Sequence, residues 1–230
     1  MPSIPEALYC VYALNRLGAV ANMIHPLASE NEIRHYLNEV KSTVFVMFTG
    51  TYELCKESIS KTDVKKAIVV SPAQSLSLPF KTIYHLKNKK PSFHENSIFL
   101  SWDEFMKGGN GINIEFHSHN PNEMAVISHT GGTTGEPKGV MCSDRNINSL
   151  ISQISCCMDY DRQERYMSVL PPFINYSLVN SMLEPLYFGF TVILIPQYDP
   201  HKFFDYIKKY RPNHISSIPN YWETVITMPQ

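Results

Sequence analysis

The first seventy residues alternate between helical and extended patterns of apolar residues. Four apolar side chains recur at helical spacing and predict a first helix: Ala7, Val11, Leu14 and Leu17. Ser3 and Glu6 have the spacing of a capping box at its start, Pro5 suits its first turn, and Gly18 ends the pattern. Further along, the pattern predicts strands over 20–24, 43–48 and 67–70, a helix capped by Ser29 and Glu32, and a helix over 52–60.

The same alternation returns after residue 123. It predicts strands over 124–128, 166–170, 191–195 and 214–218. It also predicts four helices: one capped by Ser143 that runs to about residue 157, one over 177–188, one that begins at Asp199 with Pro200 in its first turn, and one that begins at Asn220. Between the two halves, residues 72–122 are rich in Ser, Pro, Asn, Gly and Lys and predict an irregular connecting region of loop and short strands, one near 98–100. Strands that alternate with helices predict an α/β fold with largely parallel sheets flanked by helices.

Composition and charge exclude several classes of protein. The 230 residues are 43% hydrophobic and 18% charged, which is ordinary for a globular chain. The net charge is −1, so no global basic field exists to attract nucleic acid. No stretch approaches the ~18 consecutive apolar residues of a membrane span, and the N-terminus does not resemble a signal peptide.

The cysteines and histidines suggest neither a disulfide framework nor a zinc site. Five cysteines occur, an odd number, and no pair has CxxC spacing, which indicates reduced thiols in a cytoplasmic protein. His117 and His119 could bind a metal, but no third ligand is near them in sequence, so a hydrated loop is the favoured interpretation.

The segment from Ser128 to Gly139 carries the candidate chemistry. Its three glycines, 131, 132 and 135, allow close approach of the backbone to a ligand, and successive N–H groups in such a turn form an anion-binding concavity. Threonines 130, 133 and 134 add hydroxyl groups, Lys138 adds a mobile positive charge, and Pro137 stiffens the exit. We expect this loop to join a strand to a helix, where α/β sheets bind ligands.

Two other interpretations of this loop are weaker. A Walker A loop has Gly before its Lys and Ser or Thr after it, whereas Pro137 precedes and Gly139 follows Lys138. This disfavours a generic P-loop phosphotransferase. A flexible surface turn with a chance lysine would not require glycines, threonines, proline and lysine together at this spacing.

The run from Thr130 to Gly139 resembles the signature of the adenylate-forming superfamily, which includes acyl-CoA synthetases, firefly-type luciferases and adenylation domains of peptide synthetases. It departs from the usual signature at Gly131, where serine is common. Weaker similarities extend over nearly the whole chain apart from 72–122: residues 16–20 with His25-Pro26, residues 170–173, residues 185–189 and residues 217–219.

The resemblance implies that a carboxylate attacks the α-phosphate of MgATP, that pyrophosphate leaves, and that the acyl group then passes to a thiol, often coenzyme A. It implies cofactor-binding roles for Thr130, Gly131, Gly132, Thr133, Thr134, Gly135 and Lys138 around the β- and γ-phosphates. Lys138 and Thr133 are the candidates for offsetting developing charge, and Thr134 is the candidate contact for Mg²⁺. Phe173, Ile174 and Asn175 are implied to line the acid pocket, although core packing is an equal interpretation of Phe173 and Ile174.

One departure from the superfamily bears on the substrate. The superfamily often has His after the pocket Phe, and amino-acid-activating members often have Asp, whereas this chain has Ile174. Ile174 cannot pair with an ammonium group, and an unpaired buried ammonium is costly. We therefore expect a fatty, short-chain or aromatic acid rather than an amino acid; an amino-acid-activating adenylation domain is the alternative that Asn175 keeps open.

A second departure is that the superfamily's later motifs do not occur in these 230 residues. We therefore expect residues 1–230 to be part of the large N-terminal AMP-binding domain, with the C-terminal domain absent, and to be inactive alone in complete adenylation. A non-catalytic nucleotide-binding module or pseudoenzyme is the competing hypothesis. A truncated sheet would expose strand edges, so a homo-oligomer is a possible state.

Overall fold

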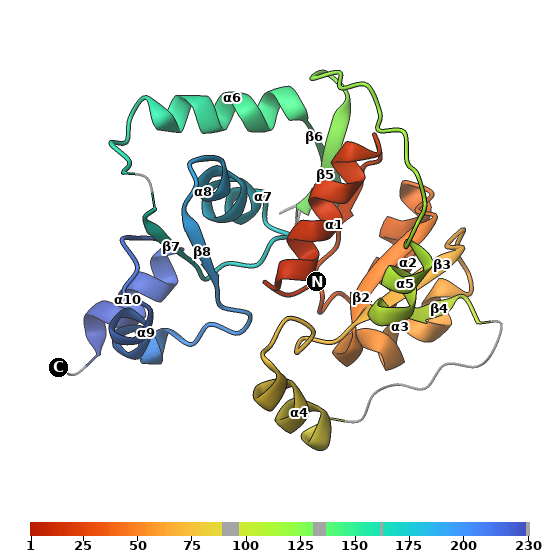
Figure 1. The fold of residues 1–230 in the computed structure, drawn as a ribbon, viewed down its shortest axis with the longest axis horizontal. Coiled ribbons are helices and arrows are strands. Elements are labelled where there is room, and N and C mark those ends of the chain that lie inside the picture. The colour runs from red at the N-terminus through yellow and green to blue at the C-terminus, as the bar shows by residue number, and fades with distance from the viewer. Residues whose placement is uncertain (89–96, 131–136, 162, 229–230) are drawn as a thin grey trace.

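The structure is a computed structural model that describes residues 1–88, 97–130, 137–161 and 163–228. Its described strands form three three-stranded sheets, and five of the six strand pairings are parallel. Helices flank these sheets (Figure 1). The predicted α/β class with largely parallel sheets is therefore confirmed.

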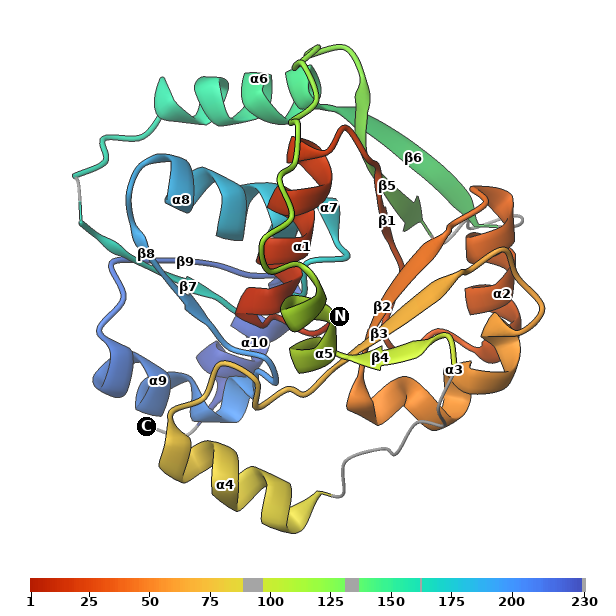
Figure 2. The same ribbon diagram turned by 45° about the vertical axis from the view of Figure 1, so that its right-hand side comes forward.

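The N-terminal part follows the predicted alternation. Its elements are α1 (Pro5–Arg16), β1 (Ala21–Met23), α2 (Glu30–Glu39), β2 (Val44–Phe48), η1 (Thr49–Thr51), α3 (Tyr52–Ile59) and β3 (Lys66–Val70). Ser29 and Glu32 form the predicted capping box of α2. α2 and α3 lie beside the sheet of order β2-β3-β4 (Figure 2). Their buried side chains, such as Leu37 and Ile59, share a core cluster with residues of this sheet.

The predicted capping box of the first helix is wrong. Ile4 occupies the N-cap position of α1 and makes no side-chain capping bond. Ser3 instead donates a hydrogen bond to the carbonyl oxygen of Leu170 (3.2 Å), and the carboxylate of Glu6 accepts one from Ser75. Both residues are only 2% exposed. Ser3 and Glu6 therefore make tertiary contacts instead of a helix cap. Their spacing in the sequence is the same in either case, so it does not reveal which of the two forms.

Residues 72–122 contain more regular structure than predicted. They hold α4 (Leu78–Lys87), β4 (Phe99–Ser101) and α5 (Trp102–Gly108). β4 confirms the short strand predicted near this position, but the two helices are a correction. α4 buries none of its side chains, and its large apolar residues, such as Phe80 and Leu86, are exposed. α5 begins with a capping box formed by Ser101 and Glu104 and buries Trp102.

The C-terminal part keeps most predicted elements with altered ends. They are β5 (Met124–Thr130), β6 (Lys138–Ser143), α6 (Asp144–Ser155), β7 (Arg165–Ser168), α7 (Asn175–Leu178), a π-helical turn η2 (Val179–Leu183), α8 (Glu184–Tyr187), β8 (Thr191–Leu194), η3 (Pro200–Lys202), α9 (Phe203–Tyr210), β9 (His214–Ser216) and α10 (Pro219–Thr227). Ser143 and Asp199 cap α6 and η3 as predicted. Asn220 does not cap α10, because Ile218 is the N-cap and Pro219 is the first helical residue.

A shared apolar cluster joins α1 to the second half of the chain. Leu8 and Val11 of α1 pack with Val126 of β5, and with Leu178 and Met182 of the helix that runs through α7, η2 and α8. This cluster supports the sheet of order β1-β5-β6, whereas β8-β7-β9 has a core of its own. None of the helices in the described ranges combines the length and apolar character needed to cross a bilayer.

Candidate active site

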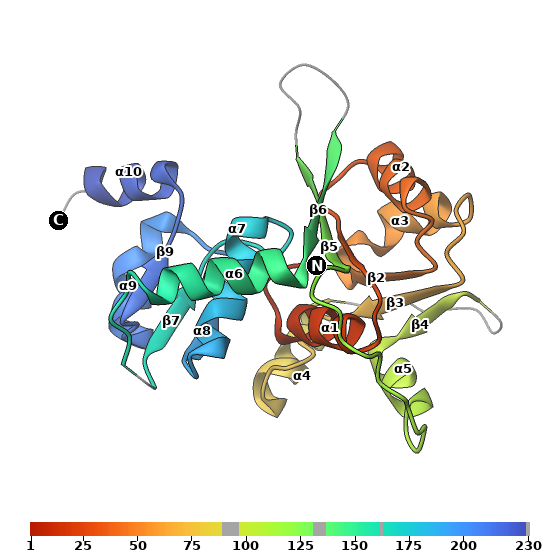
Figure 3. The same ribbon diagram turned by 90° about the horizontal axis from the view of Figure 1, so that it is seen from above.

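The phosphate-binding loop predicted from the sequence connects two strands rather than a strand and a helix. β5 and β6 pair in antiparallel fashion, with Thr130 opposite Lys138 and Met124 opposite Ser143 (Figure 3). α6 begins at Asp144, at the opposite end of this hairpin from the loop. The expected strand-to-helix connection is therefore wrong. Residues 138–143 form β6, which pairs with β5, and Ser143 then caps α6. The N-terminus of α6 is therefore at the end of the hairpin opposite to Thr130 and Lys138.

The described residues place only the two ends of this loop. Thr130 is exposed, and its hydroxyl lies 3.5 Å from the carbonyl oxygen of Lys138. The Lys138 side chain is exposed. The predicted binding residues Gly131, Gly132, Thr133, Thr134 and Gly135 lie outside the described residues.

His129 fixes the loop end of the hairpin, a role that sequence reasoning did not assign. Its Nε2 lies 2.6 Å from Oδ1 of Asn22 in β1, and its ring stacks on Tyr36 of α2 at 3.9 Å. The amide group of Asn22 donates to the carbonyl oxygen of Tyr36, so Oδ1 is left as the acceptor and Nε2 of His129 carries the hydrogen. Burial lowers the pKa of His129, which favours this neutral form. No sequence signal reveals the contact, since 107 positions separate the two partners.

The predicted acid-pocket residues lie beside the same hairpin. Asn175 accepts a hydrogen bond from the hydroxyl of Ser128 in β5 (2.5 Å) and donates one to Sγ of Cys142 in β6 (3.4 Å). Its amide group therefore ties the start of α7 to both strands of the hairpin. Ile174 is 37% exposed, and Phe173 is half-buried.

His25 joins Phe173 at this place. The two rings have centroids 4.3 Å apart and are inclined by 56°. The backbone N–H of Leu27 donates to Nδ1 of His25 (2.9 Å). Burial is the main cause that lowers the pKa of His25. An apolar cavity of about 830 Å³, lined by residues of α1, β1 and β2, extends to both His25 and Phe173.

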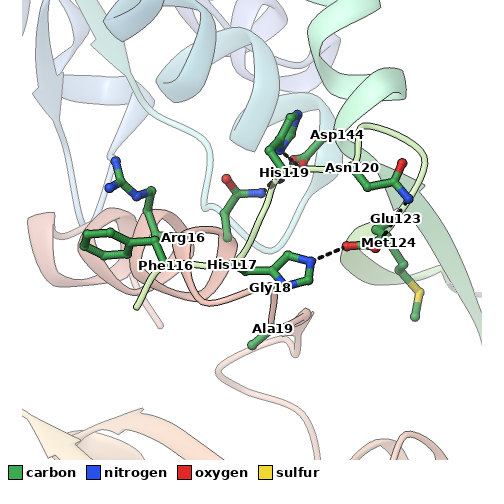
Figure 4. Close-up of a pocket in the computed structure, with 11 residues that line it drawn as sticks. Arg16, Gly18, Ala19, Phe116, His117, His119, Asn120, Glu123, Met124 and Asp144 are labelled. Atoms are coloured by element: carbon green, nitrogen blue, oxygen red, sulfur yellow. Dashed lines mark hydrogen bonds and ion pairs between the residues drawn. The ribbon is translucent and has the colours of Figure 1, made fainter. Parts of the chain in front are cut away.

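A second hollow of about 340 Å³ lies at the end of α1 and contains the two histidines considered as metal ligands (Figure 4). His117 contacts Glu123 at 2.8 Å, whereas His119 lies 3.5 Å from Asp144. Each imidazole thus faces a different carboxylate. Within the described ranges, no group of three or more His, Cys, Asp or Glu side chains is arranged to hold a metal ion.

Comparison with known proteins identifies the family. The AMP-binding enzyme family matches residues 1–230. The chain is 24% identical to a long-chain-fatty-acid–CoA ligase of Bacillus subtilis, over 100% of this chain and 42% of the relative. It is also 24% identical to a mitochondrial malonate–CoA ligase of Xenopus laevis, over 86% of this chain and 30% of the relative.

Solved structures agree on the fold. An anthranilate CoA ligase in complex with anthranoyl-AMP superposes with a TM-score of 0.83 at 14% identity, over 100% of this chain and 41% of that one. A long-chain-fatty-acid–CoA ligase from Archaeoglobus fulgidus gives 0.76 at 23% identity, over 98% of this chain and 40% of that one. The chain belongs to the AMP-binding enzyme family. It spans about two fifths of the length of the Bacillus relative and of both structures.

Proposed function

We propose that this chain supplies the phosphate-binding loop and one wall of the acid pocket of an acid–thiol ligase. In the proposed reaction a carboxylic acid and MgATP give an acyl-adenylate and pyrophosphate, and the acyl group then passes to coenzyme A. The observation that carries the proposal is that Asn175 holds the acid-pocket segment directly against the hairpin that bears the loop. The two substrates would therefore meet at one end of this hairpin.

Electrostatic stabilisation is the proposed contribution of the loop. Negative charge builds on the phosphates as the carboxylate attacks, and fixed N–H groups, hydroxyls and a cation lower that barrier. Thr130 and Lys138 pair at the two ends of the loop. We assign to Lys138 the role of offsetting charge on the leaving pyrophosphate. We assign the remaining contacts to Gly131, Gly132, Thr133, Thr134 and Gly135. Magnesium arrives with ATP as substrate, and Thr134 is its proposed contact.

We propose a fatty, short-chain or aromatic acid, rather than an amino acid, as the substrate. Ile174 gives no partner for an ammonium group, and the side chain of Asn175 is engaged by Ser128 and Cys142. The fatty-acid and malonate relatives show that several acids are activated in this family. We propose the cytoplasm as the working compartment, because all five cysteines are free thiols.

Carboxylate-dependent exchange of pyrophosphate into ATP tests the proposal. The assay is run on this chain and on the longest natural product of its gene, with decanoic, benzoic and amino acids in parallel. We expect exchange by the longer protein alone, with a non-amino acid as substrate, and we expect Lys138→Ala in that protein to abolish it. Lys61→Ala, an exposed lysine in the turn after α3, is the matched control and should leave exchange unchanged.

Binding without exchange would favour the competing function. ATP binding measured by calorimetry, with no exchange by either protein, would indicate a nucleotide-binding module or pseudoenzyme. Preference for an amino acid would contradict the proposed substrate class.

Sedimentation of the purified chain tests whether it forms the homo-oligomer that we expect from its exposed apolar side chains, such as Val44 of β2.

A further inference from the structure

His25 leaves its sheet at the same edge as the phosphate-binding loop. β1 and β5 run parallel, with Met23 in register with Ser128. Two residues beyond this pair the chain reaches His25 on one side and Thr130, the last residue of β5, on the other. The carboxyl ends of neighbouring parallel strands meet at one edge of a sheet, which is where α/β folds bind ligands. His25 therefore lies beside the entrance of the loop.

The acid pocket reaches the same imidazole from the other side. The ring of Phe173 packs on His25, and both residues line the 830 Å³ apolar cavity. His25 is thus located between Thr130, the last described residue before the loop, and the apolar cavity that it shares with Phe173. In the proposed adenylation reaction, the carboxylate of an acid in this cavity would meet ATP at this junction.

The hydrogen bonds of His25 leave one donor available. Nδ1 accepts from the backbone N–H of Leu27, so in the neutral ring Nε2 carries the hydrogen. Among the residues that the structure describes, none accepts a hydrogen bond from this Nε2, and the side chain is exposed. Partial desolvation of the ring lowers the pKa of His25, which favours the neutral form.

The neighbouring pocket residues do not offer an equivalent group. Ile174 has no polar atom in its side chain, and both polar atoms of the Asn175 side chain are bonded to the hairpin. The Phe173 ring is apolar. Among these four residues, His25 is therefore the one that offers an available side-chain donor.

We propose that His25 binds the carboxylate of the acid, with Nε2–H donating a hydrogen bond to one carboxylate oxygen. The other oxygen then attacks the α-phosphorus of ATP. The new bond joins carboxylate oxygen to phosphorus, the bond from the α-phosphorus to the bridging oxygen breaks, and pyrophosphate leaves with that electron pair. His25 keeps its proton throughout. This assignment rests on the proposed adenylation function and names a residue that orients its acid substrate.

The test uses a stable adenylate mimic, decanoyl-sulfamoyl-adenosine, whose acyl carbonyl stands in for the bound carboxylate oxygen. Its affinity and that of ATP are measured by calorimetry for the wild-type chain, His25→Phe, which keeps a ring against Phe173, and His25→Gln, which keeps an N–H donor. We expect His25→Phe to weaken binding of the mimic about tenfold and His25→Gln to restore most of it, with ATP affinity unchanged. His201→Phe, an exposed histidine remote in sequence, is the matched control.

The outcomes separate this assignment from the function on which it rests. Equal affinity of wild type and His25→Phe for the mimic would overturn the assignment and leave the proposed function standing. Loss of affinity in His25→Phe and His25→Gln alike, with ATP still bound, would also overturn it, because a donor would then not be the decisive group. If the longest natural product of the gene also binds neither ATP nor the mimic, the proposed function and the assignment are both overturned.

Discussion

His129 lies nearly flat on Tyr36, with ring centroids 3.9 Å apart and planes inclined by 26°. Tyr36 belongs to the buried face of α2 and is 6% exposed, so the hairpin that carries the loop is fixed to the core of the neighbouring sheet. Asn22 of β1 holds the same imidazole in the plane of the ring. Stacking and hydrogen bonding thus fix His129 in two directions, immediately before the loop begins at Thr130.

Replacing His129 by Phe should separate these two contributions. His129→Phe keeps a ring for Tyr36 but leaves Oδ1 of Asn22 without its donor, which costs about 1 to 3 kcal/mol of unfolding free energy. Urea denaturation measures this loss. The control variant His201→Phe should change the free energy of unfolding by less than about 0.5 kcal/mol. If both variants unfold at the wild-type urea concentration, the hydrogen bond to Asn22 is not a stabilising contact.

The stacking itself is measured by a double-mutant cycle. Tyr36→Leu and His129→Leu are made singly and together, and the free energies of unfolding are compared. We expect a coupling energy of about 0.5 to 1.5 kcal/mol, because an offset-stacked ring pair contributes this much beyond the area that it buries. Strictly additive effects would contradict a direct ring–ring interaction.

The sequence predicted the alternation of elements because most strands and helices here carry local signals. Ser29 with Glu32, Ser143, and Asp199 mark helix starts through bonds made within three residues, and the structure keeps each of them. Ser3 and Glu6 have an equally good local pattern, but their partners are Leu170 and Ser75, which no local pattern contains. These two tertiary hydrogen bonds therefore form in place of the capping box that the spacing predicts.

The candidate site was predictable in its loop and not in its surroundings. Glycines, threonines and Lys138 identify the phosphate-binding segment because their chemistry is tied to consecutive residues. The contacts of His129 with Asn22, and of Asn175 with Ser128, depend on strand register across 107 and 47 positions. The hairpin was missed for a related reason, since Lys138 to Ser143 is short and follows the glycine-rich loop at once.

Stability should fall on acidification because of His129. Burial lowers the pKa of His129 in the folded chain below the ordinary histidine value of about 6.5, so the unfolded chain binds more protons between the two values. The stabilisation is present above pH 6.5 and is lost as pH falls through the folded-state pKa. Urea denaturation from pH 7.5 to 5 should show this decline, with a shallower slope in His129→Gln. Identical slopes for the two proteins would assign the decline to other groups.

Asn175 should stabilise the junction between the acid-pocket segment and the hairpin. Asn175→Ala removes the acceptor of the Ser128 hydroxyl. Ser128 is only 4% exposed, so its hydroxyl would be left buried without a partner. We expect a loss of about 1 to 3 kcal/mol in the free energy of unfolding. Ser128→Ala in the Asn175→Ala background should cost less than in the wild-type chain, because the unpaired hydroxyl is then removed. Equal costs in both backgrounds would show that the two side chains are not coupled.

Gly18 should not tolerate a side chain, and two other glycines provide the matched controls. Its φ of +67° costs a non-glycine residue about 1 to 2 kcal/mol, and an added Cβ would lie 2.5 Å from Cγ of His117. Gly111→Ala has the same kind of strain at φ +79° with open space around it, and Gly108→Ala meets neither obstacle. We expect thermal denaturation to rank the variants with Gly18→Ala least stable, Gly111→Ala next, and Gly108→Ala equal to or above wild type. If Gly18→Ala and Gly111→Ala lose the same stability, His117 moves aside without cost, and the contact between α1 and the segment around His117 is weaker than the geometry indicates.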